Sequence, residues 1–327
     1  MIVIRSQGEK GLVETDAVVR NCWVDARNVD KNDLARLETE FGIAGELLAD
    51  IMDADEQARV EKEDAYTAVI VRLPVYDATF EVSYFTLPLG IVLFSDKIVT
   101  VCQGTSDALD DLARNRIRDF NIRNKSAFVL NLLGRAAFVY LRALKDLNKK
   151  TAVIERELQK SVKNNELIQL LSLQKSLVYF TTSLKTNELL LEKLQKSPLM
   201  RFKEDESELL EDVLTENKQA IEMANIYSSI LTGMMDAFAS VISNNLNIVM
   251  KRLTIVSIVL MIPTLLVSFF GMNVDLPFQN NPYTFVGIIG ACLATSGFGA
   301  FLLRDKKRKK LTALALPYSH SYMMVSK

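Results

Sequence analysis

The chain has 327 residues, and its 39 Lys and Arg residues almost balance its 40 Asp and Glu residues, giving a formal net charge of −1 at pH 7. This balance excludes a strongly basic nucleic-acid-binding protein, because such proteins bind by neutralising phosphates. One histidine and three dispersed cysteines disfavour a zinc site and a disulfide framework. The charges are unevenly spread, because residues 253–303 carry only Asp275. The sequence therefore predicts a charged soluble body joined to a membrane segment.

Residues 1–120 have the pattern of a cytosolic domain that mixes helices and strands. Short runs rich in Val, Ile, Phe and Tyr predict strands at residues 2–5, 22–25, 66–73, 89–94 and 97–102. Helical spacing of apolar residues predicts helices over 33–42 and 45–60. The chain contains no glycine-rich phosphate-binding motif and no nucleophile–base set. We therefore expect neither a nucleotide site nor an enzyme.

Residues 121–252 predict long helices, which we interpret as a stalk. Most of this segment lacks proline and glycine, and its apolar residues recur at steps of three and four. We expect a turn near residues 163–165 and a helix end before Pro198. A further helix that starts near Asp205 is expected to continue without a break to about Gly271.

Two uncharged runs, residues 253–271 and 283–303, are long enough to cross a bilayer, which takes about 20 apolar residues. The linker between them, residues 272–282, is short and contains two prolines. The pair predicts a hairpin of two transmembrane helices joined by an external loop. The alternative is a helical hairpin buried in a soluble core, which two runs of this length without a charge disfavour.

Lysine and arginine near the two spans predict their orientation. Lys251 and Arg252 precede the first span, most of residues 304–310 are basic, and the linker has neither Lys nor Arg. Both flanks are therefore expected to be cytoplasmic, including the basic tail at 304–327. The sequence predicts a multi-pass protein of the cell membrane with both termini in the cytoplasm.

One stripe along the last long helix is polar although its neighbours are apolar. Alternating steps of four and three select Asp236, Ser240, Ser243, Asn247, Met250, Thr254, Ser257, Met261, Thr264, Ser268 and Gly271. A 3.5-residue repeat keeps such a stripe facing one partner helix. Small residues also let membrane helices pack closely, but a stripe without Leu, Ile or Val favours a water-lined path. One helix cannot enclose a path, so this interpretation requires a symmetric ring of subunits.

The first span ends in Gly271-Met272-Asn273, directly before the external loop. A C-terminal two-span hairpin with this tripeptide at the end of its first helix resembles the CorA family of magnesium channels. Residues 243–264 are also similar to the pore helix of that family. The resemblance covers essentially the whole chain. It implies an α+β membrane protein with an N-terminal α/β cytosolic domain, long stalk helices and a transmembrane hairpin, assembled as a homopentameric funnel.

The resemblance also implies roles for single residues. Asn273 matches a ring at the outer mouth and, with Gly271 and Met272, forms the expected selectivity filter. Met250 and Leu253 match a hydrophobic constriction, so Leu253, rather than Thr254 of the regular stripe, is expected to face the pore. Asp236 matches an acidic ring at the cytosolic end. The expected pore-lining residues are Asp236, Ser243, Asn247, Met250, Leu253, Ser257, Met261, Thr264 and Ser268.

Mg²⁺ is implied both as the transported ion and as a regulator of its own influx, with cobalt and nickel as further candidates for transport. The family has a regulatory divalent-cation site between neighbouring cytosolic domains, and Asp64 and Asp212 resemble its two carboxylates. One departure concerns the external loop, which lacks the Met-Pro-Glu element of many members and has Asp275 as its only acid. The alternatives are a zinc or other transition-metal transporter on the same scaffold, or a membrane-tethered cytosolic scaffold.

Overall fold

The computed structural model describes residues 1–8, 11–117, 120–160, 164–196, 202–273 and 283–303. The chain divides into two units, Met1–Phe238 and Ala239–Lys327. The division falls inside helix α6 (Glu204–Phe270), which therefore contributes residues to both units. The expected external loop beyond Asn273, up to residue 282, and the expected basic tail at 304–327 lie outside the described residues.

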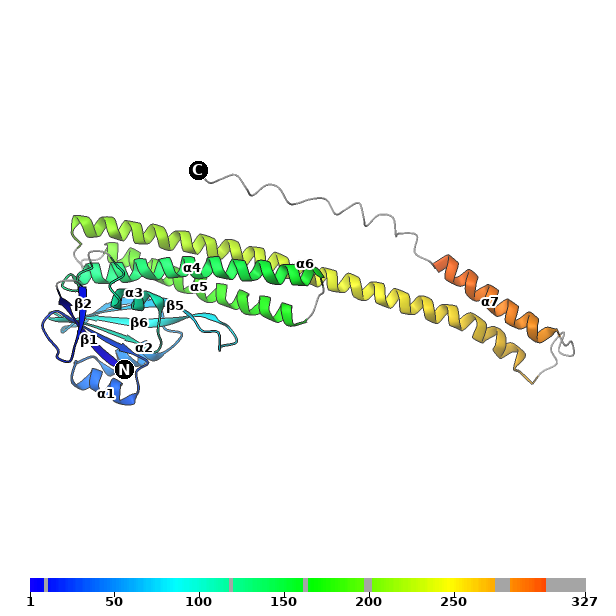
Figure 1. Cartoon of the computed structure of the whole chain (residues 1–327), viewed down its shortest axis with the longest axis horizontal. Coiled ribbons are helices and arrows are strands. Elements are labelled where there is room, and N and C mark those ends of the chain that lie inside the picture. The colour runs from blue at the N-terminus through cyan, green and yellow to red at the C-terminus, as the bar shows by residue number, and fades with distance from the viewer. Residues whose placement is uncertain (9–10, 118–119, 161–163, 197–201, 274–282, 304–327) are drawn as a thin grey trace. The chain divides into compact units, whose positions relative to one another are not determined.

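The first unit is built on a seven-stranded sheet with the strand order β2-β1-β3-β7-β6-β5-β4 (Figure 1). Strands β3 and β7 pair in parallel, and the other neighbours pair antiparallel. The strands are β1 Ile2–Gly8, β2 Gly11–Thr15, β3 Cys22–Arg27, β4 Arg59–Lys62, β5 Thr67–Tyr76, β6 Tyr84–Leu93 and β7 Lys97–Cys102. All five strands expected from the sequence are present, and β6 begins at Tyr84 instead of residue 89.

The expectation of one helix over residues 45–60 is wrong. Helix α2 (Gly45–Met52) ends before Asp53, whose backbone is extended, and Arg59–Lys62 forms β4 at the edge of the sheet. Three of the four residues of β4 are charged. Charged edge strands protect a sheet from further pairing, but they lack the apolar alternation that reveals a strand in a sequence.

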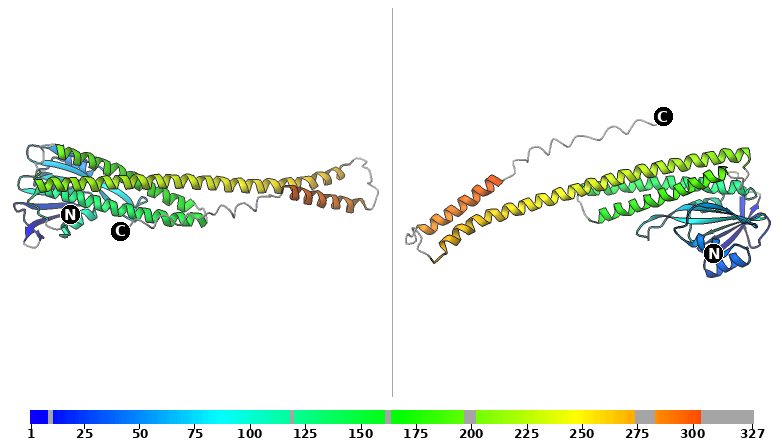
Figure 2. Two further views of the ribbon diagram at one scale, coloured as in Figure 1. Left: turned by 90° about the horizontal axis from the view of Figure 1, so that it is seen from above. Right: turned by 180° about the vertical axis from the view of Figure 1, so that it is seen from behind.

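Helices cover both faces of the sheet (Figure 2). Helix α1 (Lys31–Thr39) and α2 pack on one face, in a core that contains Leu37, Ile51 and Val24. On the other face, Trp23 packs in a core shared by α3 (Asp107–Ala113), α4 (Lys125–Lys160), α5 (Asn164–Lys196) and the start of α6. Consecutive residues of a strand point to opposite faces, which is why Trp23 and Val24 belong to different cores.

The three long helices of the first unit form a further core, to which strand β6 contributes Tyr84. Tyr140 and Leu144 of α4, Phe180 of α5 and Leu231 of α6 are buried there. By length and composition α4 could cross a membrane, but 61% of its most apolar window is buried in the unit. The apolar residues of α4 are therefore explained by helix packing and by the sheet beneath.

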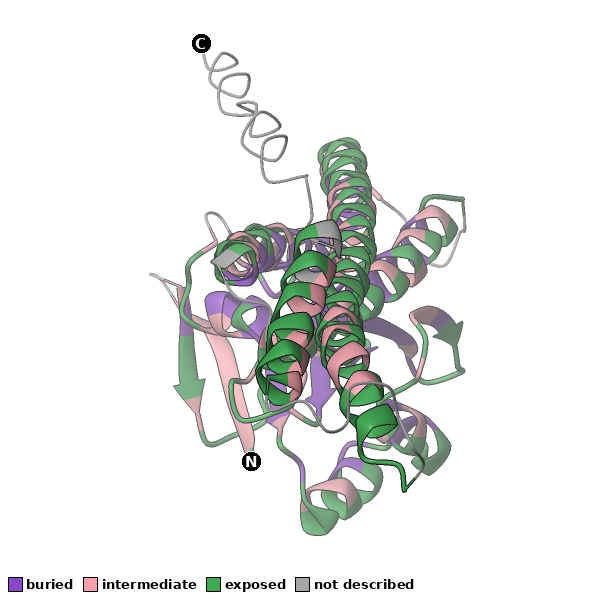
Figure 3. Ribbon diagram, turned by 90° about the vertical axis from the view of Figure 1, so that its right-hand side faces the viewer, coloured by how far each residue is buried: buried purple, intermediate pink, exposed green. Residues whose placement is uncertain are grey.

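The second unit contains the C-terminal part of α6 and α7 (Thr284–Leu303). Helix α6 ends within one residue of the predicted position, and its most apolar window is 0% buried. None of the described residues 239–273 and 283–299 is buried in the single chain (Figure 3). Exposed apolar surface of this extent marks contact with a membrane or with other protein. The α+β architecture expected from the sequence is confirmed.

Candidate pore helix and metal-binding residues

Helix α7 contacts one face of α6 in the second unit. Ser296 Oγ lies 3.5 Å from the carbonyl oxygen of Val259, and Cys292 Sγ lies 3.9 Å from that of Pro263. A Cβ added at Gly299 would lie 3.8 Å from side-chain atoms of Val259 and Ile262. The half-buried residues of α6 between 251 and 270 all belong to this face: Ile255, Val259, Ile262, Pro263 and Leu266.

The polar stripe lies on the opposite side of α6. At about 100° per residue, Ser257, Thr264 and Ser268 lie roughly 140–200° around the helix from Val259 and Leu266. The predicted pore-lining residues from Ser243 to Ser268 are all exposed in the single chain. Helix α7 therefore covers one apolar strip of α6 and leaves the polar stripe accessible.

The hydroxyl groups of the stripe have a common hydrogen-bond pattern. Thr254, Ser257 and Thr264 each donate to the carbonyl oxygen four residues earlier, at distances of 2.8–3.0 Å. Each hydroxyl has one proton and two lone pairs. Because the proton is donated within α6, the oxygen can only accept hydrogen bonds from groups outside the helix. Water molecules around a cation can donate such bonds.

The tripeptide Gly271-Met272-Asn273 lies at the C-terminal end of α6. The amide of Gly271 donates to Val267 O at 3.0 Å, and the amide of Met272 donates to Phe269 O at 3.3 Å. The helix therefore tightens in its last turn, and Asn273 follows as an exposed residue. A helix C-terminus carries a partial negative charge from its unpaired carbonyls, so it attracts cations.

The remaining predicted pore residues differ in character. Met250 and Leu253 are 53% and 59% exposed, although both are apolar. Asp236 is exposed on the part of α6 that belongs to the first unit. Within the described chain, neighbouring residues therefore leave more than half of each of these two apolar side chains uncovered.

The two carboxylates expected for regulation lie in different parts of the first unit. Asp64 is exposed in the turn between β4 and β5, beside a cavity of about 360 Å³ that Lys62 and Lys125 also line. Asp212 is exposed on α6; partial burial raises the pKa of Glu216, one turn further along, and the negative charge of Asp212 adds to this shift. Among the described residues, no group of three or more His, Cys, Asp or Glu side chains could hold a metal ion.

Three of the acidic residues that precede Asp64 in the sequence pair with one arginine. Arg59 in β4 lies 2.6 Å from carboxylate oxygens of both Asp50 and Glu61 and also pairs with Glu56. These three acids are thus structural partners of a cation. Their sequence pattern alone could equally be interpreted as part of a metal sensor.

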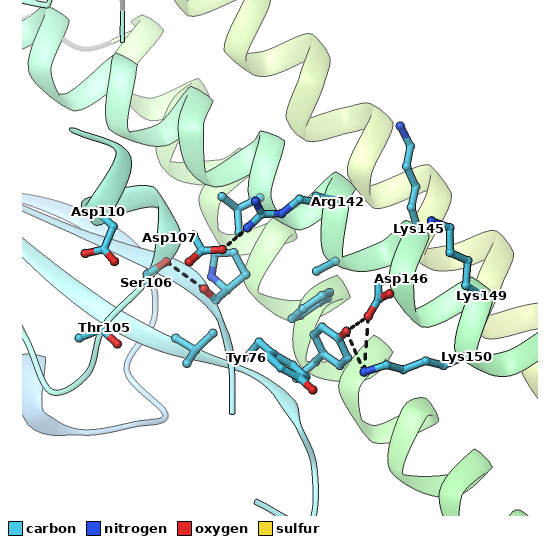
Figure 4. Close-up of a pocket in the computed structure, with 16 residues that line it drawn as sticks. Tyr76, Thr105, Ser106, Asp107, Asp110, Arg142, Lys145, Asp146, Lys149 and Lys150 are labelled. Carbon is cyan, nitrogen blue, oxygen red and sulfur yellow. Dashed lines mark hydrogen bonds and ion pairs between the residues drawn. The ribbon is translucent and has the colours of Figure 1, made fainter. Parts of the chain in front are cut away.

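A further group of charged residues lines a cavity of about 640 Å³ between the sheet, α3 and α4 (Figure 4). The hydroxyl of Tyr84 donates to Asp146, and Lys150 Nζ donates to the same hydroxyl at 3.1 Å. Burial and the bond to Asp146 raise the pKa of Tyr84 to about 12. On the other side of the cavity Arg142 pairs with Asp107. The first pair attaches α4 to strand β6, and the second attaches α4 to α3. No signal in the sequence predicted them, because the partners are far apart in the chain.

Comparison with known proteins decides the family. Residues 20–308 match the family model described as CorA-like Mg²⁺ transporter protein. The chain belongs to this family. The identification made from Gly271-Met272-Asn273 and the two apolar runs is therefore confirmed.

Two curated CorA proteins are similar to this chain over most of its length. The cobalt/magnesium transport protein CorA of Methanocaldococcus jannaschii is 28% identical over 271 residues, which cover 81% of this chain and 84% of that protein. The cobalt/magnesium transport protein CorA of Thermotoga maritima is 24% identical over 265 residues, which cover 77% and 73% of the two chains.

A solved structure shares the fold. The complete structure of the CorA magnesium transporter from Methanocaldococcus jannaschii has a TM-score of 0.77 and 23% sequence identity, and the match covers 94% of this chain and 98% of that one. The CorA fold therefore extends over both units of this chain.

Proposed function

We propose that this chain is one subunit of a homopentameric channel that admits Mg²⁺ into the cell down its electrochemical gradient, with cobalt and nickel as further candidate ions. One observation carries the proposal: in a CorA family member, the polar stripe of α6 faces away from α7 and leads to Gly271-Met272-Asn273. A ring of such helices encloses a polar path when α7 lies outside and the stripes face the axis.

The proposed topology has residues 1–120 as the cytosolic domain, 121–252 as the stalk, and 253–271 and 283–303 as the transmembrane helices. Residues 272–282 form the external loop, and the basic tail at 304–327 returns to the cytoplasm. This arrangement rests on the absence of charge in the two spans and on the basic residues at their flanks. The membrane potential supplies about 4.6 kcal/mol per 100 mV for a dication that moves inward.

Magnesium enters this path as a hydrated ion. Mg²⁺ loses its water shell reluctantly and prefers oxygen ligands. The Asn273 side chains and the carbonyls at Gly271 accept hydrogen bonds from the ion's water molecules, and the negative end of α6 favours the cation. Further along, the hydroxyl oxygens of Thr264 and Ser257 offer acceptors of the same kind. No carboxylate within the span holds the ion, which favours its release.

Met250 and Leu253 form the proposed constriction near the cytosolic end of the span. Their apolar side chains exclude water when the ring is narrow, and a dry segment stops hydrated ions. Asp236, Ser243 and Asn247 line the path on its cytosolic side. In this scheme the exposed positions of Met250 and Leu253 in the single chain are accounted for by the neighbouring subunits.

Regulation is assigned to Asp64 and Asp212, which we place on two sides of a subunit boundary. Two carboxylates about 4 Å apart repel each other by roughly 4 kcal/mol at an effective dielectric constant near 20. A bound Mg²⁺ reverses this repulsion and holds the closed assembly together. When cytosolic Mg²⁺ falls, the boundary loosens and the constriction opens.

Uptake of Mg²⁺ into proteoliposomes that contain the purified chain tests the function. Wild-type protein is expected to carry Mg²⁺ faster under an inside-negative potential, and parallel assays with Zn²⁺ and Co²⁺ compare the alternative ions. Asn273→Ala should abolish flux while the oligomer stays intact in size-exclusion chromatography. Asn244→Ala, which changes an exposed amide off the stripe, is the matched control and should conduct as wild type does. Wild-type flux in Asn273→Ala would refute the assigned filter, and Zn²⁺ uptake without Mg²⁺ uptake would favour the zinc transporter.

A further inference from the structure

Pro263 lies in the apolar part of α6, between the stripe residues Met261 and Thr264. Proline has no backbone N–H, and its ring crowds the carbonyl of the residue four positions earlier. In α6 that carbonyl belongs to Val259. In a hydrocarbon environment a carbonyl without a donor is strongly unfavourable, so a neighbouring side chain usually supplies the hydrogen bond.

Helix α7 supplies the donor here. The hydroxyl of Ser296 donates to Val259 O at 3.5 Å, a long hydrogen bond. One turn away on α7, Cys292 Sγ lies 3.9 Å from the carbonyl oxygen of Pro263 itself. The two carbonyls are four residues apart on α6, and Cys292 and Ser296 are four residues apart on α7. Both contacts are therefore consistent with a single antiparallel alignment of α7 against α6.

Two further features belong to the same arrangement. The hydroxyl of Thr264 donates to Leu260 O at 2.8 Å, so the carbonyl next to that of Val259 also has a side-chain donor. Gly299 faces α6 at the same level of α7, since a Cβ there would lie 3.8 Å from side-chain atoms of Val259 and Ile262, an ordinary van der Waals distance. The backbone around Pro263 is thus held from α7 on one side and by Thr264 on the other.

We propose that Ser296 is a positioning residue for the conducting helix: it replaces the hydrogen bond that Pro263 removes from Val259, and so fixes how Met261 and Thr264 face the ion path. The reference to an ion path rests on the proposed function. The hydrogen bond and its compensation of Pro263 do not, and they can be measured without ion transport.

A double-mutant cycle on the full-length chain tests this role. Ser296→Ala removes the donor, and Pro263→Ala returns a backbone N–H to Val259 O. Ser296→Ala alone is expected to lower Mg²⁺ flux per assembled oligomer by about threefold to fifteenfold, which corresponds to one hydrogen bond between membrane helices. In the Pro263→Ala background the same substitution should have no further effect, because the backbone donor is already present.

Two variants on α7 serve as controls. Thr295→Ala removes a neighbouring hydroxyl that donates to Ala291 O at 2.8 Å within α7, so flux should stay at the wild-type level. Ser296→Thr keeps a hydroxyl at the position and should restore most of the flux. If Pro263→Ala fails to assemble, the contrast between Ser296→Ala and Ser296→Thr still decides, because equal losses in both would exclude a role for the hydroxyl.

The same double-mutant cycle can be measured without ion transport, from the melting temperature of the assembled protein in detergent. The destabilisation caused by Ser296→Ala should disappear in the Pro263→Ala background, whether or not the protein conducts Mg²⁺. Equal destabilisation in both backgrounds would overturn the inference, as would wild-type melting and flux in Ser296→Ala. A cycle that couples in melting without any flux in the wild type would instead count against the proposed function alone.

Discussion

The hydroxyl groups of Thr254, Ser257 and Thr264 donate their protons to backbone carbonyls within α6. Each hydroxyl therefore has only its oxygen lone pairs left for an interaction outside the helix. A free hydroxyl can turn its proton toward a cation, which is unfavourable. A hydroxyl that already donates to a carbonyl presents only its oxygen. Of these residues, Ser257 and Thr264 belong to the proposed pore lining, where their oxygens would suit a hydrated cation.

Met250→Ser is predicted to increase Mg²⁺ flux. Replacing a thioether with a hydroxyl at the proposed constriction makes the ring wider and wettable, which lowers the barrier set by dewetting. Flux into proteoliposomes at fixed protein content measures the change. Val249→Ser alters the adjacent exposed position off the stripe and is expected to leave the rate as it is. An unchanged rate in Met250→Ser would place the gate elsewhere.

Glu216→Gln is predicted to stabilise the protein at neutral pH. Partial desolvation and the charge of Asp212 raise the pKa of Glu216, which is exposed on α6, so the folded form holds this proton more tightly than the unfolded form does. Its contribution to stability is therefore present below the ordinary pKa of glutamate and is lost as pH rises through the raised value. The variant should melt at a higher temperature at pH 7 and at the same temperature below about pH 4.

The control for this pH dependence is Glu222→Gln, which changes an exposed carboxylate further along the same helix. It should melt as wild type does at both pH values. If Glu216→Gln gave the same gain at pH 4 as at pH 7, the gain would come from packing and not from the removed charge.

At the scale of elements, different parts of the single helix α6 make different contacts. Its first part buries Leu210 and Val213 against the sheet, and its later part contacts α7 through Val259 and Ile262. Its C-terminus carries Gly271, where helical hydrogen bonding ends. Because the same helix carries Asp212 and the Met250–Leu253 pair, it would connect the proposed regulatory site to the proposed constriction.

Gly271→Ala is predicted to reduce flux without destabilising the subunit. A Cβ at this position would lie 3.5 Å from Val267 O and 3.7 Å from Ser268 O, which are ordinary contacts within the helix. Five added methyl groups around the proposed ring would, however, crowd the hydrated ion. Melting of the oligomer and Mg²⁺ uptake measure the two effects. Lower stability with normal uptake would show that the glycine serves the fold and not the filter.

At the scale of the whole molecule, a single chain leaves many large apolar side chains exposed. Leu260 is 64% exposed and Phe298 is 63% exposed in the second unit, and Ile230 of the first unit is 50% exposed. A bilayer and neighbouring subunits together would cover such surface. The proposed regulatory site is likewise placed between two subunits, with Asp64 and Asp212 on its two sides.

Magnesium is predicted to protect the stalk from protease, because a ligand stabilises the form that it binds. Replacing both Asp64 and Asp212 with Asn should remove part of this protection and weaken closure by cytosolic Mg²⁺. Lys at both positions should instead mimic the bound ion. Proteolysis in high and low Mg²⁺ measures the effect, with Glu46→Gln plus Glu157→Gln as control substitutions of exposed acids. Full protection in the Asn variant would show that both carboxylates are only solvated surface.

The sequence by itself determined the features that depend on local pattern. The end of α6, the two apolar runs and Gly271-Met272-Asn273 were predictable because periodicity, charge and a tripeptide are read along the chain. The family followed from them. Five strands of the sheet were predictable for the same reason.

Only the tertiary structure decided which distant groups meet. Arg72 lies in a predicted strand, but its burial and its bonds of 2.6 and 2.7 Å to the carbonyls of Ala54 and Glu56 required the folded chain. The pairing of Ser296 with Val259 likewise joins residues 37 positions apart. Such contacts depend on how elements pack, and packing satisfies buried polar groups wherever a partner is near in space, irrespective of distance along the chain.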